Sequence, residues 1–413
     1  MMLRFEIKKV CAKTGSRVAL LLLLALVLLC SFFAADVTYI DENGDRQSGP
    51  AAAKELRAAR AKWAGPLDEE KIRLAIAENR KIRETPQARS TDTRENDIAY
   101  SWGQGVQNIR DLLNCSFAKS FRDYDYYRAD SLSEADAPCF YENRIRLLRE
   151  WLETEASDQF SDSEKQYLLA SYAALETPFD YAYMDGFTRL FEYSPTVIMI
   201  TMLVLGYLVA GIFSNEFSWK SDAIFFSSLH GRGKAVRAKA AAGLCIVTAV
   251  YWAVILLYSA IVLACLGTGG SQCPVQAYWG SWKCFYPITI GQKYALVVLG
   301  GYVGCLFLSC MCMLVSAKTK SAVLSVLVPF VLVFVPSFLG NINSPLVAKI
   351  IGLLPDQLLQ VSNSLDYFNV YSLAGRVFGA IPLLFALYGA LFVALPPLIC
   401  RTYRYYSRLG SRS

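Results

Sequence analysis

The stretch GRGKAV at residues 231–236 is the part of this sequence that comes closest to a phosphate-binding loop. A P-loop of the form GxxxxGK[ST] cradles phosphates with backbone N–H groups and holds magnesium with its final hydroxyl. GRGKAV lacks both the leading glycine and the hydroxyl residue, and the pattern occurs nowhere else in the chain. The sequence therefore predicts that this chain does not bind ATP in the P-loop manner, and no residue stands out as catalytic.

Cysteine and histidine are the next candidates for chemistry. Of twelve cysteines, Cys115 and Cys139 lie in a long polar segment, and Cys273 and Cys284 lie between two apolar runs. If those parts face an oxidising compartment, each pair could close a loop of 23 or 10 intervening residues, although sequence alone does not fix the pairing. Metal binding is the weaker interpretation, because the only histidine is His230 and no CxxC occurs outside the apolar runs.

The chain has the composition of a membrane protein with one large polar insertion. Of its 413 residues, 54% are hydrophobic and 18% are charged. An apolar helix of roughly 17 to 25 residues crosses the hydrocarbon core of a bilayer. Six runs of this kind are Val18–Ala35, Pro195–Phe213, Ala240–Leu266, Tyr294–Ser316, Ser321–Leu339 and Val377–Cys400.

Lys and Arg in the flanks of these runs predict the orientation, because they are retained on the cytoplasmic side. The N-terminal 17 residues contain five basic residues and one acid, and the tail at 401–413 contains four arginines and no acid. Residues 36–195 contain 30 acids and 21 basic residues. We expect both termini in the cytoplasm and an extracytoplasmic domain at 36–194, and we do not interpret the net charge of +6 as a nucleic-acid surface. The first run could also be a cleaved signal peptide, but its length and its poor cleavage site favour a retained anchor.

The predicted outer domain has helical patterns. FYENRIRLLREWLE places Ile145, Leu148, Trp151 and Leu152 on one stripe, and Ser161 with Glu164 has the spacing of a capping box. We interpret the stripe as domain core. The aromatic segment SFAKSFRDYDYYRADS at 116–131 is either a recognition surface or a loop packed on its own domain. Residues 85–104 are the expected flexible stretch.

No acidic residue lies inside the six runs, whereas ion-coupled transporters need ionisable groups there. The segment 341–363, broken by Pro345 and Pro355, predicts short re-entrant or interfacial helices before the last run. A few charged residues flank these elements, and we expect them to be interfacial anchors that reach water. They are Lys293, Lys349, Asp356, Asp366 and Arg376.

The polar stretch between the second and third runs, 214–239, reads FSNEFSWKSDAIFFSSLHGRGKAVRAK from Phe213 onward. Apolar residues beside charges predict a short helix at the membrane surface that docks on a partner. A glutamate below the second run, a short helix, a Gly-Arg turn and a lysine entering the third run resemble permease subunits of ATP-binding-cassette exporters of the type-2 permease superfamily. The residues that carry the match are Glu216, Gly231, Arg232 and Lys239; members commonly have a proline where this chain has His230.

The resemblance implies a mainly α membrane protein with six transmembrane helices and a coupling helix that seats in a cytoplasmic ATPase subunit. The ATP and magnesium would lie on that subunit, and this chain would hold no cofactor. The other partners would be a second permease copy or a sister permease, with no nucleic acid. We expect the coupling contacts at Glu216, Phe217, Phe225, Leu229, Gly231, Arg232 and Lys239.

The expected function is export of a hydrophobic or amphipathic substrate, such as a peptide, drug or lipid, across the cell membrane. One alternative is a membrane receptor whose outer domain binds a peptide or a cell-envelope ligand without transport. A membrane-embedded enzyme is a third class, but it would need a polar cluster in or beside the apolar runs.

Overall fold

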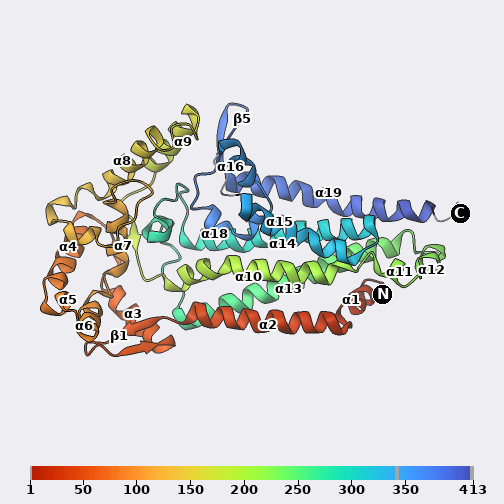
Figure 1. Ribbon diagram of the computed structural model, residues 1–413, viewed down its shortest axis with the longest axis horizontal. Helices are drawn as coiled ribbons and strands as arrows, with labels where there is room; N and C mark the ends of the chain where they lie inside the picture. Colours follow the sequence, from red (N-terminus) through yellow and green to blue (C-terminus); the bar gives the residue numbers. More distant parts are fainter. Residues whose placement is uncertain (1, 340–343, 410–413) are drawn as a thin grey trace.

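A bundle of long apolar helices carries a polar domain at one end. The computed structural model describes residues 2–339 and 344–409, so Arg412 of the predicted basic tail and residues 341–343 of the predicted short helices lie outside the described residues. Figure 1 shows the long helices side by side, with the polar domain at one end and both chain ends at the other. We call these the domain end and the terminal end. The long helices are α2 (Thr14–Ala35), α10 (Asp185–Ala210), α13 (Lys234–Leu266), α14 (Ile290–Thr319) and α19 (Ala380–Leu409).

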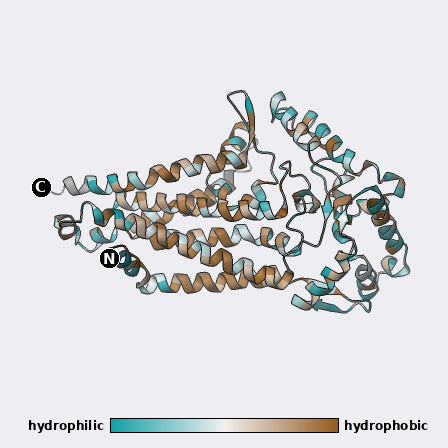
Figure 2. Ribbon diagram, turned by 180° about the vertical axis from the view of Figure 1, so that it is seen from behind, coloured by the Kyte–Doolittle hydropathy of each residue, from teal (hydrophilic) through white to brown (hydrophobic). Residues whose placement is uncertain are grey.

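Within the described residues, these five helices are long and apolar enough to cross a membrane. A helix satisfies its own backbone hydrogen bonds, as any segment inside hydrocarbon must. The apolar colour follows the bundle and fades at both ends (Figure 2). The sixth predicted span corresponds to α15 (Ala322–Leu339), an apolar helix that is shorter than the other five. The model thus has five of the six predicted spans, and the sixth stays a prediction.

Helix α10 corrects the predicted boundary between the polar domain and the second span. The helix begins at Asp185, and Pro195 lies inside it rather than at its start. Asp185 is in the first turn, where the helix dipole favours a negative charge, and Arg60 of α3 (Gly49–Ala61) forms a salt bridge with it. The polar residues before Pro195 therefore extend the helix beyond its apolar part.

The polar domain is mainly helical. Antiparallel strands β1 (Thr38–Ile40) and β2 (Arg46–Ser48) form a hairpin near its start. A second antiparallel pair, β3 (Gly65–Pro66) with β4 (Asp180–Tyr181), joins an early segment of the domain to its last residues. Its other helices are α4 (Glu69–Arg83), α5 (Pro86–Arg89), α6 (Thr93–Gly103), α7 (Gln107–Ser116), α8 (Cys139–Glu153) and α9 (Asp162–Ala173), with 3₁₀ turns at Arg128–Ser131 and Glu134–Asp136.

Two details of this domain confirm the sequence analysis and one corrects it. Leu148, Trp151 and Leu152 are buried in a core cluster, and the capping box of Ser161 and Glu164 is present. The stretch expected to be flexible, 85–104, instead forms α5 and α6. The Asp92 carboxylate accepts hydrogen bonds from the first N–H groups of α6, which gives this polar sequence a helix start.

Short elements cover the domain end of the bundle before α19. They are α16 (Pro345–Ile351), α17 (Asp356–Leu359), α18 (Val361–Ser364) and an antiparallel hairpin of β5 (Val370–Leu373) and β6 (Arg376–Gly379). Two 3₁₀ turns, Val275–Ala277 and Trp279–Ser281, join α13 to α14. The short helices were expected, but the last span begins at Ala380 and not at Val377, which belongs to the hairpin.

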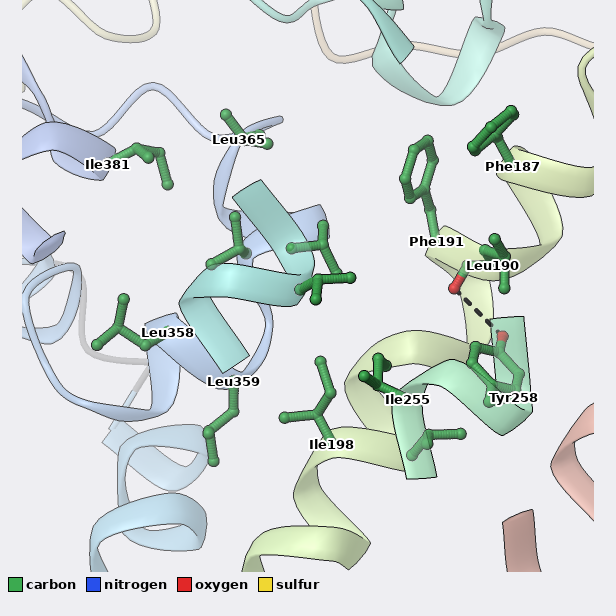
Figure 3. Packing of buried hydrophobic residues seen from close by; sticks show 14 of the residues in the cluster. Phe187, Leu190, Phe191, Ile198, Ile255, Tyr258, Leu358, Leu359, Leu365 and Ile381 are labelled. Carbon is green, nitrogen blue, oxygen red and sulfur yellow. Dashed lines mark hydrogen bonds between the residues drawn. The ribbon is translucent and has the colours of Figure 1, made fainter. Parts of the chain in front are cut away.

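Apolar packing holds the long helices to one another and the short elements to the bundle. Figure 3 shows Leu190 and Phe191 of α10 beside Tyr258 of α13, and the Tyr258 hydroxyl donates to the Leu190 carbonyl at 3.3 Å. On the other side, α17 approaches α14 closely at Gly304, where a Cβ atom would lie 2.8 Å from Leu359 Cδ2. The glycine therefore lets Leu358 and Leu359 become fully buried.

The charged residues at the domain end are not all solvated anchors, and this expectation was wrong for Lys293 and Asp356. Lys293 is 1% exposed, and its ammonium lies 2.9 Å from Asp366 Oδ2 and 2.7 Å from Ser281 Oγ. Asp356 is buried and accepts hydrogen bonds from two glutamine side chains. Both groups have polar partners, as buried charges require. Lys293 joins two separate segments in this way, whereas the partners of Asp356 lie within four residues of it.

Candidate functional site: the tip at the terminal end

The segment predicted to contact a partner lies at the terminal end of the bundle. It forms two short helices, α11 (Asn215–Ser218) and α12 (Asp222–Ser227), followed by a turn at 228–233 that enters α13. Figure 1 places α11 and α12 near both chain ends and opposite the polar domain. The N-terminal helix α1 (Met2–Cys11) packs against α13 at this end. We call residues 214–233 the tip.

A buried ion pair forms the base of the tip. Glu216 Oε1 lies 2.7 Å from Lys239 Nζ, and the two residues are 3% and 0% exposed. Lys239 also donates to the Ile212 carbonyl at 2.9 Å and lies 3.3 Å from Glu6 of α1. Lys9 of α1 donates a second hydrogen bond to Glu216 Oε1. A lysine with no exposed surface is thus surrounded by acceptors from α1, from α11 and from the turn that joins α10 to α11.

The electrostatics of Glu216 follow from this arrangement. Burial alone would raise the pKa of its carboxyl group, because it disfavours the charged form. The ammonium groups of Lys239 and Lys9 and their hydrogen bonds outweigh burial and hold the pKa of Glu216 below its ordinary value. The Tyr403 hydroxyl of α19 donates to the other carboxylate oxygen at 3.4 Å. Glu216 is therefore an ionised centre that joins four helices.

Glu216 and Lys239 were predicted as contacts for an ATPase subunit, but their side chains lie inside the chain. They hold the tip to the bundle, and their side chains are not exposed on its outer surface. The sequence analysis named both residues in one segment, but it did not predict that Glu6, Lys9 and Tyr403 would contact them. No local pattern could have found these three, because Glu6 and Lys239 are 233 positions apart and Tyr403 is 187 positions from Glu216.

Aromatic side chains fill the space above the ion pair. The rings of Phe217, Phe225 and Phe226 lie around Tyr403, with centroid distances of 5.9, 6.2 and 5.2 Å. Phe226 is buried, and the other two are half-buried against the bundle core. Contacts of this kind add about 0.5–1.5 kcal/mol each beyond area burial. Phe217 and Phe225 thus anchor the tip to α19.

The outer surface of the tip is apolar and open. Leu229 is 93% exposed, Ile224 is 75% exposed and Trp219 is 55% exposed. The ammonium groups of Lys9 and Lys13 lie 5.0 and 5.5 Å from the Trp219 ring centroid, which orients the indole beside α1. Of the predicted contact residues, Leu229 is the one whose apolar side chain is offered to solvent.

Gly231 and Arg232 shape the turn that supports this surface. A Cβ atom at Gly231 would lie 1.8 Å from the Phe225 carbonyl oxygen, so only glycine permits the close approach. The Arg232 guanidinium donates through Nε to the Phe226 carbonyl at 3.1 Å, and its side chain remains exposed. The turn thus closes back on α12 while it leaves one cation at the surface.

The other sequence candidates are not brought together into a site. Cys115, Cys139, Cys273 and Cys284 are all free thiols, and only Cys139 is exposed. The two predicted disulfide pairs are therefore not bridged in this structure. Among residues 2–339 and 344–409, no three His, Cys, Asp or Glu side chains cluster in a way that would hold a metal ion.

The tip therefore combines a buried charged base, an aromatic middle and an exposed apolar surface. Comparison of the chain with protein-family models, with curated proteins and with solved structures found no match.

Proposed function

We propose that this chain is the permease subunit of an ATP-driven exporter, and that a separate P-loop ATPase docks on the tip. The observation that carries the proposal is the open apolar surface of Ile224 and Leu229 on a base that is locked to the bundle. An exposed apolar patch on a firm support is typical of an interaction site. The substrate would be hydrophobic or amphipathic, such as a peptide, drug or lipid.

The base of the tip gives this proposal a mechanical route. A push on Leu229 would pass through the Gly231 turn and α12 to α11, and from Glu216 to Lys239 of α13. Because the same carboxylate is bonded by Lys9 and Tyr403, the ends of α1 and α19 would move with it. Helices α1, α11, α13 and α19 would then shift as one rigid unit and open a path for the substrate beside them.

The bundle also has surface for the other proposed partners, which are the bilayer and a second permease. Helices α2 and α15 expose apolar side chains along their length, among them Leu21, Phe32, Val323 and Phe330. In a bilayer such faces contact lipid or another apolar helix. We place the assembly in the cell membrane with both termini and the tip in the cytoplasm, where ATP is available.

Purification of the tagged chain from its native host in mild detergent tests this function. We expect a soluble P-loop protein to co-purify and the eluate to hydrolyse ATP. The double variant Ile224→Asp/Leu229→Asp should lose the partner, because charges would replace the apolar contact. The matched control is Leu74→Asp in α4, whose side chain is 55% exposed in the polar domain. A wild-type chain that purifies alone and without ATPase activity would contradict the proposal.

One pocket favours the receptor as a second candidate function. It has a volume of about 200 Å³ and lies among α4, α6, α7 and the aromatic segment, with Arg110, Tyr100 and Tyr126 in its wall. Arg110 is 3% exposed, and its guanidinium carbon lies 4.3 Å from the Tyr126 ring centroid. The Nη2 of Arg110 is paired with Asp130 at 3.2 Å, whereas its Nη1 is buried without a hydrogen-bond partner in the described part of the chain. A small ligand with an acidic group would pair with this Nη1. If the chain purifies alone, this pocket becomes the place to search for a ligand.

A further inference from the structure

A basic cleft separates α13 from α19 at the terminal end, on a part of the surface distinct from the exposed side chains of the tip. Its volume is about 1,020 Å³. The residues that line it are Arg237, Ala240, Ala241, Leu244, Pro396, Pro397, Cys400, Arg401, Arg404 and Tyr405. Three arginines from two helices thus face one space.

The described residues that line this cleft include three arginines and no acid. The acidic groups on the neighbouring elements α1 and α11 are Glu6 and Glu216, and both are bonded to lysines. Arg237 and Arg401 are exposed. Guanidinium groups bind phosphate well, because their planar N–H donors match its oxygens in pairs.

The cleft changes from charged to apolar along the bundle axis. On α13 the order from the terminal end inward is Arg237, Ala240, Ala241 and Leu244, and at 1.5 Å per residue the first and last lie about 10 Å apart. On α19 the arginines 401 and 404 likewise lie nearer the terminal end than Pro396 and Pro397. Small side chains leave the apolar part open. On both walls, therefore, the cations lie nearer the terminal end and the apolar side chains lie farther along the bundle. A phospholipid, with a charged headgroup and apolar chains, needs this order.

We propose that this cleft binds an anionic phospholipid, with the phosphate between the arginines and an acyl chain along Leu244 and Pro396. Basic pockets between membrane helices on the cytoplasmic side recognise lipid headgroups in this way. The bound lipid would join α13 to α19 just beside the buried ion pair, and hence would stabilise the base of the tip. The site does not depend on whether the chain is an exporter or a receptor.

Native mass spectrometry of the purified full chain tests the lipid site. The probes are phosphatidylglycerol and phosphatidylcholine with the same acyl chains, and inorganic phosphate as a free-ion competitor. We expect phosphatidylglycerol to be retained at least about 10-fold more than phosphatidylcholine, because each cation near an anionic headgroup contributes roughly a five-fold gain. Inorganic phosphate should not displace the lipid, because it lacks the acyl chain.

Two variants and one control assign the binding to the cleft. The triple variant Arg237→Gln/Arg401→Gln/Arg404→Gln should reduce retention of phosphatidylglycerol to the level of phosphatidylcholine. The control Arg4→Gln/Arg17→Gln/Lys318→Gln removes the same charge from exposed positions outside the cleft and should retain it. Ala241→Phe fills the apolar part without a change of charge and should also lower retention, which provides a readout if the triple variant does not purify.

Equal retention of the two lipids by the wild-type chain would overturn the proposal. An equal loss in the control would do the same, because it would mean that net charge alone attracts the lipid. Displacement by inorganic phosphate would show that the arginines bind a free anion only and not a lipid.

Discussion

Replacement of Glu216 by Gln is expected to lower the free energy of unfolding by about 3 kcal/mol, the cost of leaving one charge of a buried ion pair without its partner. Lys239, which has no exposed surface, would then face a neutral amide at this position and would keep Glu6, at 3.3 Å, as its one charged acceptor among the described residues. The amide keeps the shape of the side chain, so the loss reports charge and not packing. Denaturant titration of the purified chain in detergent micelles measures it.

A double variant distinguishes the loss of the ion pair from a general loss of stability in the tip. Glu216→Gln/Lys239→Met should recover part of the stability, because the fully buried ammonium is removed and the remaining carboxylate that loses a partner, Glu6, has a side chain that is 12% exposed. The matched control is Glu150→Gln, which removes an exposed pair with Arg146 at 2.8 Å and should change the stability by less than about 0.5 kcal/mol. If the double variant had a lower free energy of unfolding than Glu216→Gln, the role given to the ion pair at the base of the tip would be wrong.

The same pair predicts the direction of a pH effect. The pKa of Glu216 in the folded chain is below its ordinary value of 4.5. The contribution of the ionised Glu216 to the free energy of unfolding is therefore fully present above pH 4.5, and it is lost as the pH falls through the folded-state pKa. Glu216→Gln should remove this part of the acid sensitivity, so that the two stability curves approach each other at low pH.

Replacement of Lys293 by Met is expected to have a comparable effect at the domain end. Lys293 joins the start of α14 to Ser281 of one connection and to Asp366 of another. Its removal would leave the Asp366 carboxylate without the cation beside it, and we expect a loss of about 3 kcal/mol. The elements around α18 should also become more open, and faster amide hydrogen exchange there would report it.

The rescue for this second pair is Lys293→Met/Asp366→Asn, which leaves neither charge. The matched control is Lys81→Met in α4, whose side chain is 79% exposed and lies 3.9 Å from Glu78. It should leave the stability unchanged within about 0.5 kcal/mol. A loss at Lys293→Met no larger than that at Lys81→Met would mean that Lys293 is the solvated anchor that its sequence position first indicated.

The bundle itself could be predicted from the sequence because apolar length determines it. Five of the six predicted spans recur as long apolar helices, and the predicted short helices before the last span are present. The boundaries were less accurate. Proline was taken as a helix start at 195, but a flanking polar stretch with Asp185 in its first turn extends α10 beyond it. Local pattern alone does not reveal such an extension, because the salt bridge to Arg60 comes from a distant segment.

The sequence predicted which segment contacts a partner, but it did not predict which side chains of that segment are buried. The sequence identified a polar segment at 214–239 with Glu216, Arg232 and Lys239, and its first twenty residues, 214–233, form the tip, whereas Lys239 lies in α13. It could not distinguish which of these residues face outward, because burial of Lys239 depends on Glu6 of the N-terminal helix, far away in the chain. Lys293 was misinterpreted for the same reason, since its partner Asp366 is 73 residues away. Long-range charge pairs therefore account for most of what the sequence analysis missed.

The proposed docking of an ATPase on the tip is the central claim, and cross-linking from Leu229→Cys tests it most directly. This position is 93% exposed, and the unmodified chain serves as the background control because Cys139 and Cys245 are also exposed. The account predicts that a photoreactive group attached at Leu229→Cys cross-links to a P-loop protein in native membranes, and that ATP changes the yield. The absence of any ATP-sensitive cross-link, with Leu229→Cys labelled and the chain folded, would contradict it.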